Sequence, residues 1–283
     1  MNIKKLLVFI VFAFLPMVGI GLAINPATPI LNLGLSAGSM LLPMIAVIIT
    51  QLIFKEPVLK GLDVSFKINA WWVIGWLLMP VLAMAVLGVT LLMPGAEWTP
   101  DNEMVQMGLA SMPEGIGLAG FIALTLVSGL FAGVTLNALF AFGEEIAWRG
   151  YLLKLFSGKS FLTTALCTGV IWGLWHAPLI LKGHNYPMHP EAGILMMVAM
   201  CLLLTPMLMY FRLKSGSVIV PAIMHGTYNA VVGITNLLVT PYDDLLYGGP
   251  GLAGLIVLLV VNICLFIYDR FISKENIFFS CVD

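Results

Sequence analysis

Charged side chains are scarce in this sequence, and the shortage excludes a water-soluble globular protein. Charged residues make up 10% of the 283 residues, hydrophobic residues make up 60%, and the mean hydropathy is +1.04. A soluble fold of this size needs much more polar side-chain surface to face water. The chain is therefore predicted to be an integral membrane protein.

The sequence also lacks an excess of positive charge, since it has 13 basic and 14 acidic residues. Without a basic field, a protein has no general attraction for phosphate backbones, so nucleic acid is not an expected partner. The four cysteines are scattered and show neither a disulfide framework nor the spacing of a zinc knuckle. We interpret them as small apolar residues.

Two familiar catalytic motifs are missing as well. No His-Glu-x-x-His sequence is present, which argues against a zinc-binding helix of that type. The segment that ends in Gly158-Lys159-Ser160 resembles the end of a phosphate-binding loop, but Leu153 occupies the position of its first glycine. Zinc-helix proteases and P-loop nucleotide hydrolases are therefore not expected.

Long apolar stretches are what the sequence has in abundance. A membrane-spanning helix needs about 20 mostly apolar residues. Eight stretches meet this need, at about 6–24, 35–54, 69–93, 118–147, 161–181, 192–211, 217–240 and 250–269. The predicted fold class is an all-α, polytopic transmembrane bundle of about eight spans. Residues 1–283 are predicted to form one integral membrane domain. Its catalytic helices are expected at about 118–240. The first stretch is also compatible with a cleaved signal peptide.

The basic residues predict the orientation, because Lys and Arg accumulate in cytoplasmic loops. With eight spans, Lys182 lies alone on one side. The other basic residues fall on the opposite side: Lys4, Lys5, Lys55, Lys60, Lys67, Arg149, Lys154, Lys159, Arg212, Lys214, Arg270 and Lys274. A multi-pass membrane protein with both termini in the cytoplasm is therefore predicted.

Three predicted spans contain polar residues that are costly in lipid. An ionisable side chain within a span costs about 2.5–3.5 kcal/mol on insertion scales, so such residues indicate a functional site. They are concentrated in residues 144–149, 172–176 and 225–229. If the three helices come together at similar depths, these segments would form one site, which we expect to be entered through a cavity from the cytoplasm.

Helical spacing assigns different roles to the two adjacent glutamates. Residues four apart share a helix face, so Glu145 and Arg149 are expected to form a structural ion pair. Glu144 points about 100° away and has no cation on its own face. A carboxylate that is removed from water without a cation accepts a proton more readily, which suits general acid–base catalysis. Glu144 is therefore the catalytic candidate of the two.

The remaining polar residues suggest how a reaction could be supported. His225 and Asn229 are four residues apart, so they project from one helix face and could stabilise an oxyanion. Trp172 precedes His176 by one turn and is expected to pack beside its ring. Asn137 is interpreted as a hydrogen-bonding contact between helices. His184 and His189 lie in an outer loop and are interpreted as solvated.

These motifs together resemble the CPBP family of intramembrane proteases, which includes the type II CAAX prenyl endopeptidases and bacterial proteins linked to bacteriocin self-protection. Glu-Glu-x-x-x-Arg, an aromatic residue four positions before His, and His-x-x-x-Asn occur in this order within residues 144–229. The resemblance implies that Glu144 acts with His176 to activate water, and that His225 and Asn229 stabilise the oxyanion. Trp172 stands where the family usually has phenylalanine.

The candidate site residues do not decide whether the protein uses a metal cofactor. Glu144, His176 and His225 could ligate one zinc ion and leave a position for water, as in a metalloprotease. Such an enzyme would also need a carboxylate base, and Glu145 is expected to be committed to Arg149. Activation of water without a cofactor is therefore favoured, with zinc as the alternative.

The sequence predicts an intramembrane endopeptidase, but another class of function remains open. A non-catalytic transporter could use the same polar groups as a relay, and an immunity or scaffold protein could bind a partner without cutting it. The expected partners are membrane lipids and a peptide or protein substrate, which could carry a lipid. CAAX-type tails, peptide pheromones, bacteriocin leaders and membrane-protein segments all remain open as substrates, as does the oligomeric state.

Overall fold

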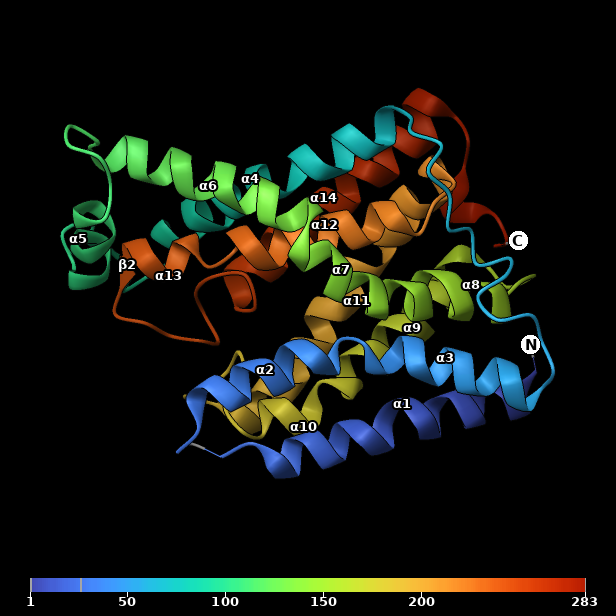
Figure 1. Ribbon diagram of the computed structural model, residues 1–283. Helices are drawn as coiled ribbons and strands as arrows, with labels where there is room; N and C mark the ends of the chain where they lie inside the picture. The colour runs from blue at the N-terminus through green and yellow to red at the C-terminus, as the bar shows by residue number, and fades with distance from the viewer. Residues whose placement is uncertain (1, 26, 283) are drawn as a thin grey trace.

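The computed structural model describes residues 2–25 and 27–282 and shows a bundle of helices with very little strand (Figure 1). The α-helices are α1 (Ile3–Ala23), α2 (Pro29–Ser39), α3 (Leu42–Ile53), α4 (Ala70–Leu91), α5 (Glu103–Ala110), α6 (Leu118–Val134), α7 (Leu136–Glu145), α8 (Leu152–Leu155), α9 (Phe161–Trp175), α10 (Ala177–Ile180), α11 (Pro190–Ser215), α12 (Ile219–Val231), α13 (Ile234–Leu238) and α14 (Leu252–Ile267). Two π-helical segments cover Ile146–Tyr151 and Tyr268–Ser273, and a 3-10 turn covers Ile277–Phe279.

Two short strands join the loops at one end of the bundle. Strand β1 (Glu97–Trp98) pairs antiparallel with β2 (Val239–Thr240), and Glu97 lies opposite Thr240. In Figure 1 this pair and α5 lie at the end opposite to both chain termini. The bundle therefore has two distinct ends, which we call the terminal end and the loop end.

The multi-pass helical architecture is found, but the predicted number of spans is not confirmed. Among the described residues, four helices are long and apolar enough to cross a bilayer: α1, α4, α11, and α14 extended to Ser273. Two bent pairs add up to two more. They are α2 with α3, bent by 41°, and α6 with residues 136–155, bent by 52°. The structure thus supports four to six spans, and the count of about eight is not confirmed.

The two predicted spans that do not reach this length are the ones that carry the histidines. Helix α9 has 15 residues and α12 has 13. Pro178 has no N–H to give to the carbonyl of Leu174, so α9 ends at Trp175. A tighter turn follows, in which the His176 N–H bonds the Gly173 carbonyl at 3.2 Å. The break beside His176 therefore shortens α9.

Small residues let α12 lie directly against α7. A Cβ atom on Gly226 would stand 2.6 Å from the backbone nitrogen of Ala138, which leaves no room for a side chain. Asn137 donates from Nδ2 to the Gly226 carbonyl at 3.2 Å, in agreement with its predicted role between helices. Close backbone contact through small residues is typical of membrane helices. It brings the His225 side of α12 towards the glutamates of α7.

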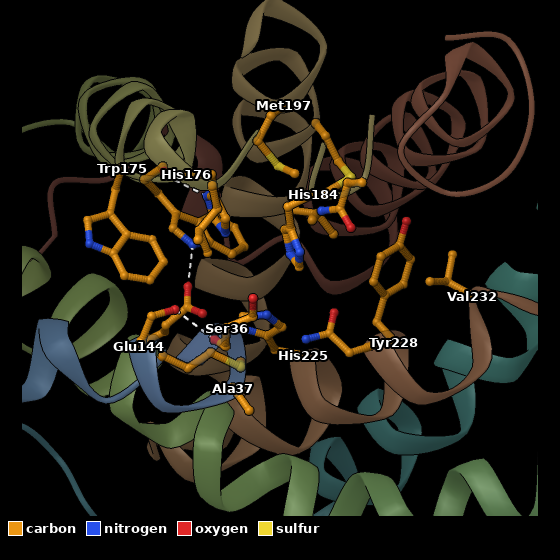
Figure 2. A pocket seen from close by; sticks show the side chains of 18 of the residues that line it. Ser36, Ala37, Glu144, Trp175, His176, His184, Met197, His225, Tyr228 and Val232 are labelled. Carbon is orange, nitrogen blue, oxygen red and sulfur yellow. Dashed lines mark hydrogen bonds between the residues drawn. The ribbon is translucent and has the colours of Figure 1, made fainter. Parts of the chain in front are cut away.

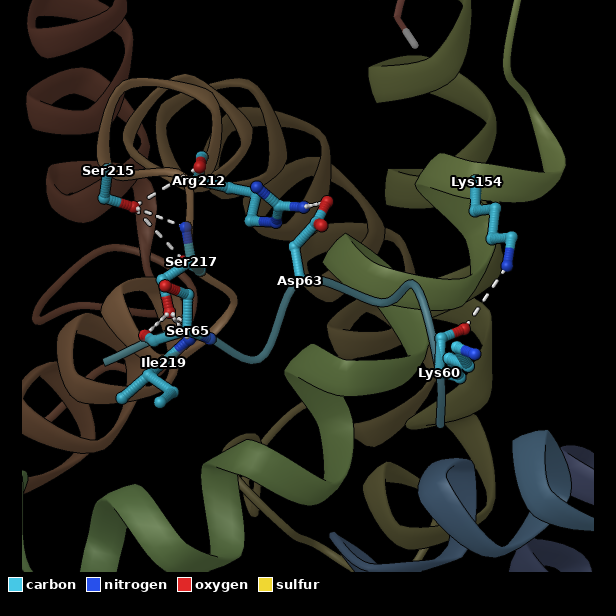
Figure 3. Close-up of polar contacts among 8 residues, drawn as sticks. All are labelled: Lys60, Asp63, Ser65, Lys154, Arg212, Ser215, Ser217 and Ile219. Carbon is cyan, nitrogen blue, oxygen red and sulfur yellow. Dashed lines mark hydrogen bonds and ion pairs between the residues drawn. The ribbon is translucent and has the colours of Figure 1, made fainter. Parts of the chain in front are cut away.

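A connection without helix closes the terminal end. Residues 54–69 link α3 to α4 and pack against the junction of α11 and α12 (Figures 1 and 3). Arg212 forms an ion pair with Asp63, and Ser217 donates from Oγ to the Ser65 carbonyl at 2.6 Å. Ser217 lies two residues before α12. These contacts fix the start of α12 and therefore the depth at which His225 lies.

Candidate active site

One cavity of about 390 Å³ is lined by every residue that the sequence predicts to be catalytic. Glu144 comes from α7, His176 from the end of α9, and His225 and Asn229 from α12. Figure 2 shows Glu144, His176 and His225 around the same space, which α2 closes on one side with Ser36 and its neighbours. The structure thus brings together side chains that lie up to 85 positions apart in the sequence, from Glu144 to Asn229.

The cavity extends towards the loop end of the bundle. Its lining reaches His184 and Asn185 in the loop after α10. Its residues from α11 lie within 197–204, in the middle of that helix. Helix α12 begins at the terminal end, so Asn229 lies one turn further from that end than His225. Entry from the side of the basic residues was expected from the sequence. The structure places the cavity lining in the middle of the bundle and towards the loop end, and entry from the cytoplasm stays a prediction.

Glu144 is held by two indole groups and has no cation partner among the described residues. Its Oε2 atom accepts hydrogen bonds from Trp172 Nε1 at 2.6 Å and from Trp148 Nε1 at 3.2 Å. The side chain is buried, with 1% of its surface exposed. Because both donors use Oε2, Oε1 makes no bond to the described part of the chain. That oxygen is free to meet a water or a substrate.

The ring of His176 has a defined orientation and tautomer. Its Nδ1 atom lies 2.9 Å from the Trp172 carbonyl. A carbonyl only accepts, so Nδ1 carries the hydrogen and Nε2 of the neutral ring keeps its lone pair. The ring centroid lies 5.0 Å from Trp175 and 6.0 Å from Trp172, so aromatic contacts limit its rotation. The expected packing of Trp172 beside His176 is found, and Nε2 is the atom that could take a proton.

Glu145 serves two partners at once. Its Oε1 atom lies 2.9 Å from Arg149 Nη1 and 2.9 Å from His225 Nδ1. Arg149 also donates to Thr205 at 3.0 Å and stacks over the Trp172 ring at 4.3 Å from its centroid. Glu145 and Arg149 are both fully buried. The predicted ion pair is therefore present, and it lies in the interior of the bundle.

This ion pair lies where α7 changes into a π-helix. Glu145 is the last residue of α7, and Arg149 lies within the π-helical segment Ile146–Tyr151. Single π-turns inside α-helices are uncommon and occur often at functional sites. Trp148 and Arg149 reach back from this turn to Glu144 and Glu145, each across four positions. The turn thus supplies one partner to each glutamate.

Two further residues of the cavity were not expected there from the sequence. His184 was interpreted as a solvated loop residue and is exposed, as expected, but it also lines the cavity. Ser36, which also lines the cavity, is the centre of a Gly-x-Ser-x-Gly sequence at residues 34–38. That sequence marks a nucleophile only on a sharp strand-to-helix turn. Ser36 instead lies within α2, and its hydroxyl bonds no histidine in the described part of the chain.

The three residues considered as zinc ligands do not form a compact donor set. Within the described residues, one group of His, Cys, Asp or Glu has all its ligand atoms within 4.8 Å of one another: His189, Asp243 and Asp244 at the loop end. Glu144, His176 and His225 do not form such a group. Asp244 is already engaged there, since it pairs with His189 Nδ1 at 2.7 Å and accepts from two backbone N–H groups. This pair fastens the loop after α10 to the loop before α14.

Comparison with known proteins gives the same resemblance as the motifs. Residues 119–231 match the family model described as type II CAAX prenyl endopeptidase Rce1-like, and this segment contains all four candidate residues. A stretch of 44 residues is 41% identical to CAAX prenyl protease 2 of Methanococcus maripaludis. The stretch covers 15% of this chain and 16% of that relative. The chain therefore matches about a sixth of the relative's length, and the resemblance to the CAAX prenyl endopeptidases is confirmed over residues 119–231.

Proposed function

We propose that this protein is an intramembrane endopeptidase that hydrolyses a peptide bond with a water activated by Glu144 and His176. The observation that carries the proposal is the meeting of an acid, two imidazoles and a carboxamide in one cavity of an apolar helical bundle. The match to a peptidase family over the same residues supports this reaction class. Because the named relative is a CAAX prenyl protease, lipid-modified peptides are the first substrates to test.

In the proposed reaction, the water lies between Oε1 of Glu144 and Nε2 of His176. One of these atoms takes a proton from the water while the water oxygen attacks the carbonyl carbon of the scissile bond. The tetrahedral intermediate then collapses, the carbon–nitrogen bond breaks, and the stored proton passes to the leaving nitrogen. The free oxygen of Glu144 and the tautomer of His176 support these roles.

His225 and Asn229 are assigned to the oxyanion that forms in this intermediate. Asn229 offers its amide N–H groups, and His225 offers Nε2 because Nδ1 faces Glu145. Donation from Nε2 requires a ring that is protonated on both nitrogens. The buried Glu145 carboxylate at 2.9 Å is the group that balances this positive charge. Glu145 is therefore a positioning residue for His225 in addition to its pairing with Arg149.

Glu144→Gln tests the assignment directly. The amide keeps the shape of the side chain and can still accept from the two indoles, but it cannot take a proton. We expect turnover to fall on the order of 10³-fold, the scale of a lost general base. The melting temperature should not fall, because no buried cation loses its partner. Products of a prenylated and an unmodified peptide library would be identified by mass spectrometry, and full activity would remove Glu144 from the mechanism.

Two controls separate this chemistry from its competitors. Ser36→Ala should leave turnover unchanged, whereas loss of activity would point to a serine nucleophile on α2. Activity that survives an excess of a strong chelator agrees with activation of water without a metal. Loss that zinc restores would assign Glu144, His176 and His225 to a metal instead. If no peptide is cleaved and Glu144→Gln abolishes solute uptake into proteoliposomes, the transporter reading is correct.

A further inference from the structure

The helix pair that walls one side of the cavity is broken in the middle of the bundle. Helices α2 and α3 are together long enough for one span, but they meet at a bend of 41°. Met40 and Leu41 are the two residues between them. Figure 1 shows this junction next to α7, far from both ends of the bundle. A continuous helix would leave no backbone group unpaired at this depth.

A proline keeps backbone acceptors free at this break. Pro43 is the second residue of α3 and has no N–H, so it cannot bond the Ser39 carbonyl four positions earlier. The N–H groups of Met40 and Leu41 turn back into α2, with bonds of 3.2 and 3.1 Å. The carbonyls of Ser39 and Met40 accept no hydrogen bond from the part of the chain that the structure describes. The break therefore holds two neighbouring acceptors without donors.

These two acceptors border the candidate active site. Ser39 and Met40 both line the larger cavity together with Glu144. A Cβ atom on Gly143 would stand 2.5 Å from the Met40 carbonyl oxygen and 2.8 Å from the Cα of Leu41. The break thus packs directly on the backbone of α7, one residue before Glu144. This contact fixes the distance between the free carbonyls and the candidate base.

The chemistry of the break suits a ligand with N–H groups. Ser39 lies in α2, and Met40 has helical backbone angles of −59° and −19°, so both carbonyls point along the axis of α2 beyond its end. A carbonyl oxygen only accepts. The Ser39 hydroxyl does not compete for a ligand, because it donates to the Ser36 carbonyl at 2.7 Å. Non-helical backbone at membrane depth is found where it lines a cavity, and an unpaired acceptor there is costly until a ligand or water fills it.

We propose that the break between α2 and α3 is a docking edge for the backbone of an extended peptide substrate, whose N–H groups are accepted by the carbonyls of Ser39 and Met40. This inference rests on the proposed peptidase function. The scissile bond is held near Glu144, because the same break packs beside that residue. Backbone bonds give affinity without reading side chains, so the edge accepts many sequences but requires an unwound segment. A helical segment has paired its own N–H groups and does not bind.

Peptides with single backbone changes test this directly. Each peptide that is found to be cleaved is remade with one amide at a time replaced by an ester, except at the scissile bond. An ester removes one N–H and keeps every side chain. We expect kcat/KM to fall about threefold to tenfold at one or two positions beside the scissile bond, the range for a lost neutral hydrogen bond. Equal cleavage of the amide and all esters would overturn the docking edge.

Pro43→Ala connects the ester effect to the break. Alanine supplies an N–H that bonds the Ser39 carbonyl within the helix, so one acceptor is lost to the substrate. We expect kcat/KM to fall for the unmodified peptide and the ester penalty to disappear at one position, without a lower melting temperature. Pro16→Ala is the matched control, because Pro16 lies inside α1 and outside the cavity lining. The same losses with Pro16→Ala, or an undiminished ester penalty with Pro43→Ala, would contradict the assignment.

Binding to the Glu144→Gln variant separates failure of the docking edge from failure of the peptidase proposal. Fluorescently labelled amide and ester peptides are titrated onto this variant, with and without Pro43→Ala. A preference for the amide that Pro43→Ala abolishes supports the docking edge even if no peptide is ever cleaved. Equal binding of amide and ester, with cleavage that still depends on Glu144, would leave the peptidase in place and show that water alone occupies the two carbonyls.

Discussion

Glu145→Gln should destabilise the protein strongly, because it leaves a buried cation without its counter-ion. Arg149 is fully buried, and its other contacts are the Thr205 hydroxyl and the Trp172 ring. Neither of these groups carries a negative charge. Removing one partner of a buried ion pair costs about 3–5 kcal/mol. At about 2–4 °C per kcal/mol for a chain of this size, the melting temperature should fall by about 6–20 °C.

The double variant Glu145→Gln with Arg149→Met separates stability from catalysis. Replacing both charges by neutral groups removes the stranded cation, so most of the lost stability should return. Turnover should stay low, because His225 still lacks the carboxylate that balances its charge. Thermal unfolding in detergent, followed by the reaction of a thiol dye with the buried Cys201, measures the first effect. A drop below 2 °C in the single variant, or additive losses in the double variant, would refute the reasoning about the ion pair.

Two further variants probe how the site is held. Trp172→Phe removes the shorter of the two hydrogen bonds to Glu144. The fold should be retained, and kcat at saturating peptide should fall about tenfold. An unchanged kcat would show that the indole N–H does not contribute to catalysis. Gly226→Ala places a methyl group 2.6 Å from the Ala138 nitrogen and should cost about 1–3 kcal/mol, with loss of turnover as α12 moves away. Gly233→Ala is the control, because a Cβ atom at Gly233 meets nothing within 4 Å and its φ of −68° is ordinary for alanine. Similar losses of stability and turnover in both variants would contradict the close-packing argument.

Contacts within one helix were predictable from the sequence. The four-residue spacing placed Glu145 beside Arg149 and His225 beside Asn229, and both pairs share a face in the structure. Apolar length and polar interruption also identified the three segments that meet in the cavity. Helical periodicity is a local property, so it is reliable where the partners belong to the same element.

Contacts between helices were not predictable, because one sequence carries no information about which faces meet. Trp172 was expected to pack on His176, and it does so, but its N–H crosses to Glu144 of another helix. His184 was interpreted as a solvated loop residue and is exposed, but the sequence did not show that its loop also lines the cavity. The count of about eight spans is not confirmed, because apolar length alone does not reveal where a proline or glycine breaks a helix.

The cavity extends from the middle of the bundle towards the loop end, whereas both chain termini lie at the terminal end. If the protein crosses the bilayer in this orientation, a reporter fused to either terminus resides in the compartment that does not supply the substrate. Products released through the same end of the cavity would likewise leave away from the fused reporter. Assays that collect products from the compartment of a tagged terminus would then find nothing, even with a fully active enzyme.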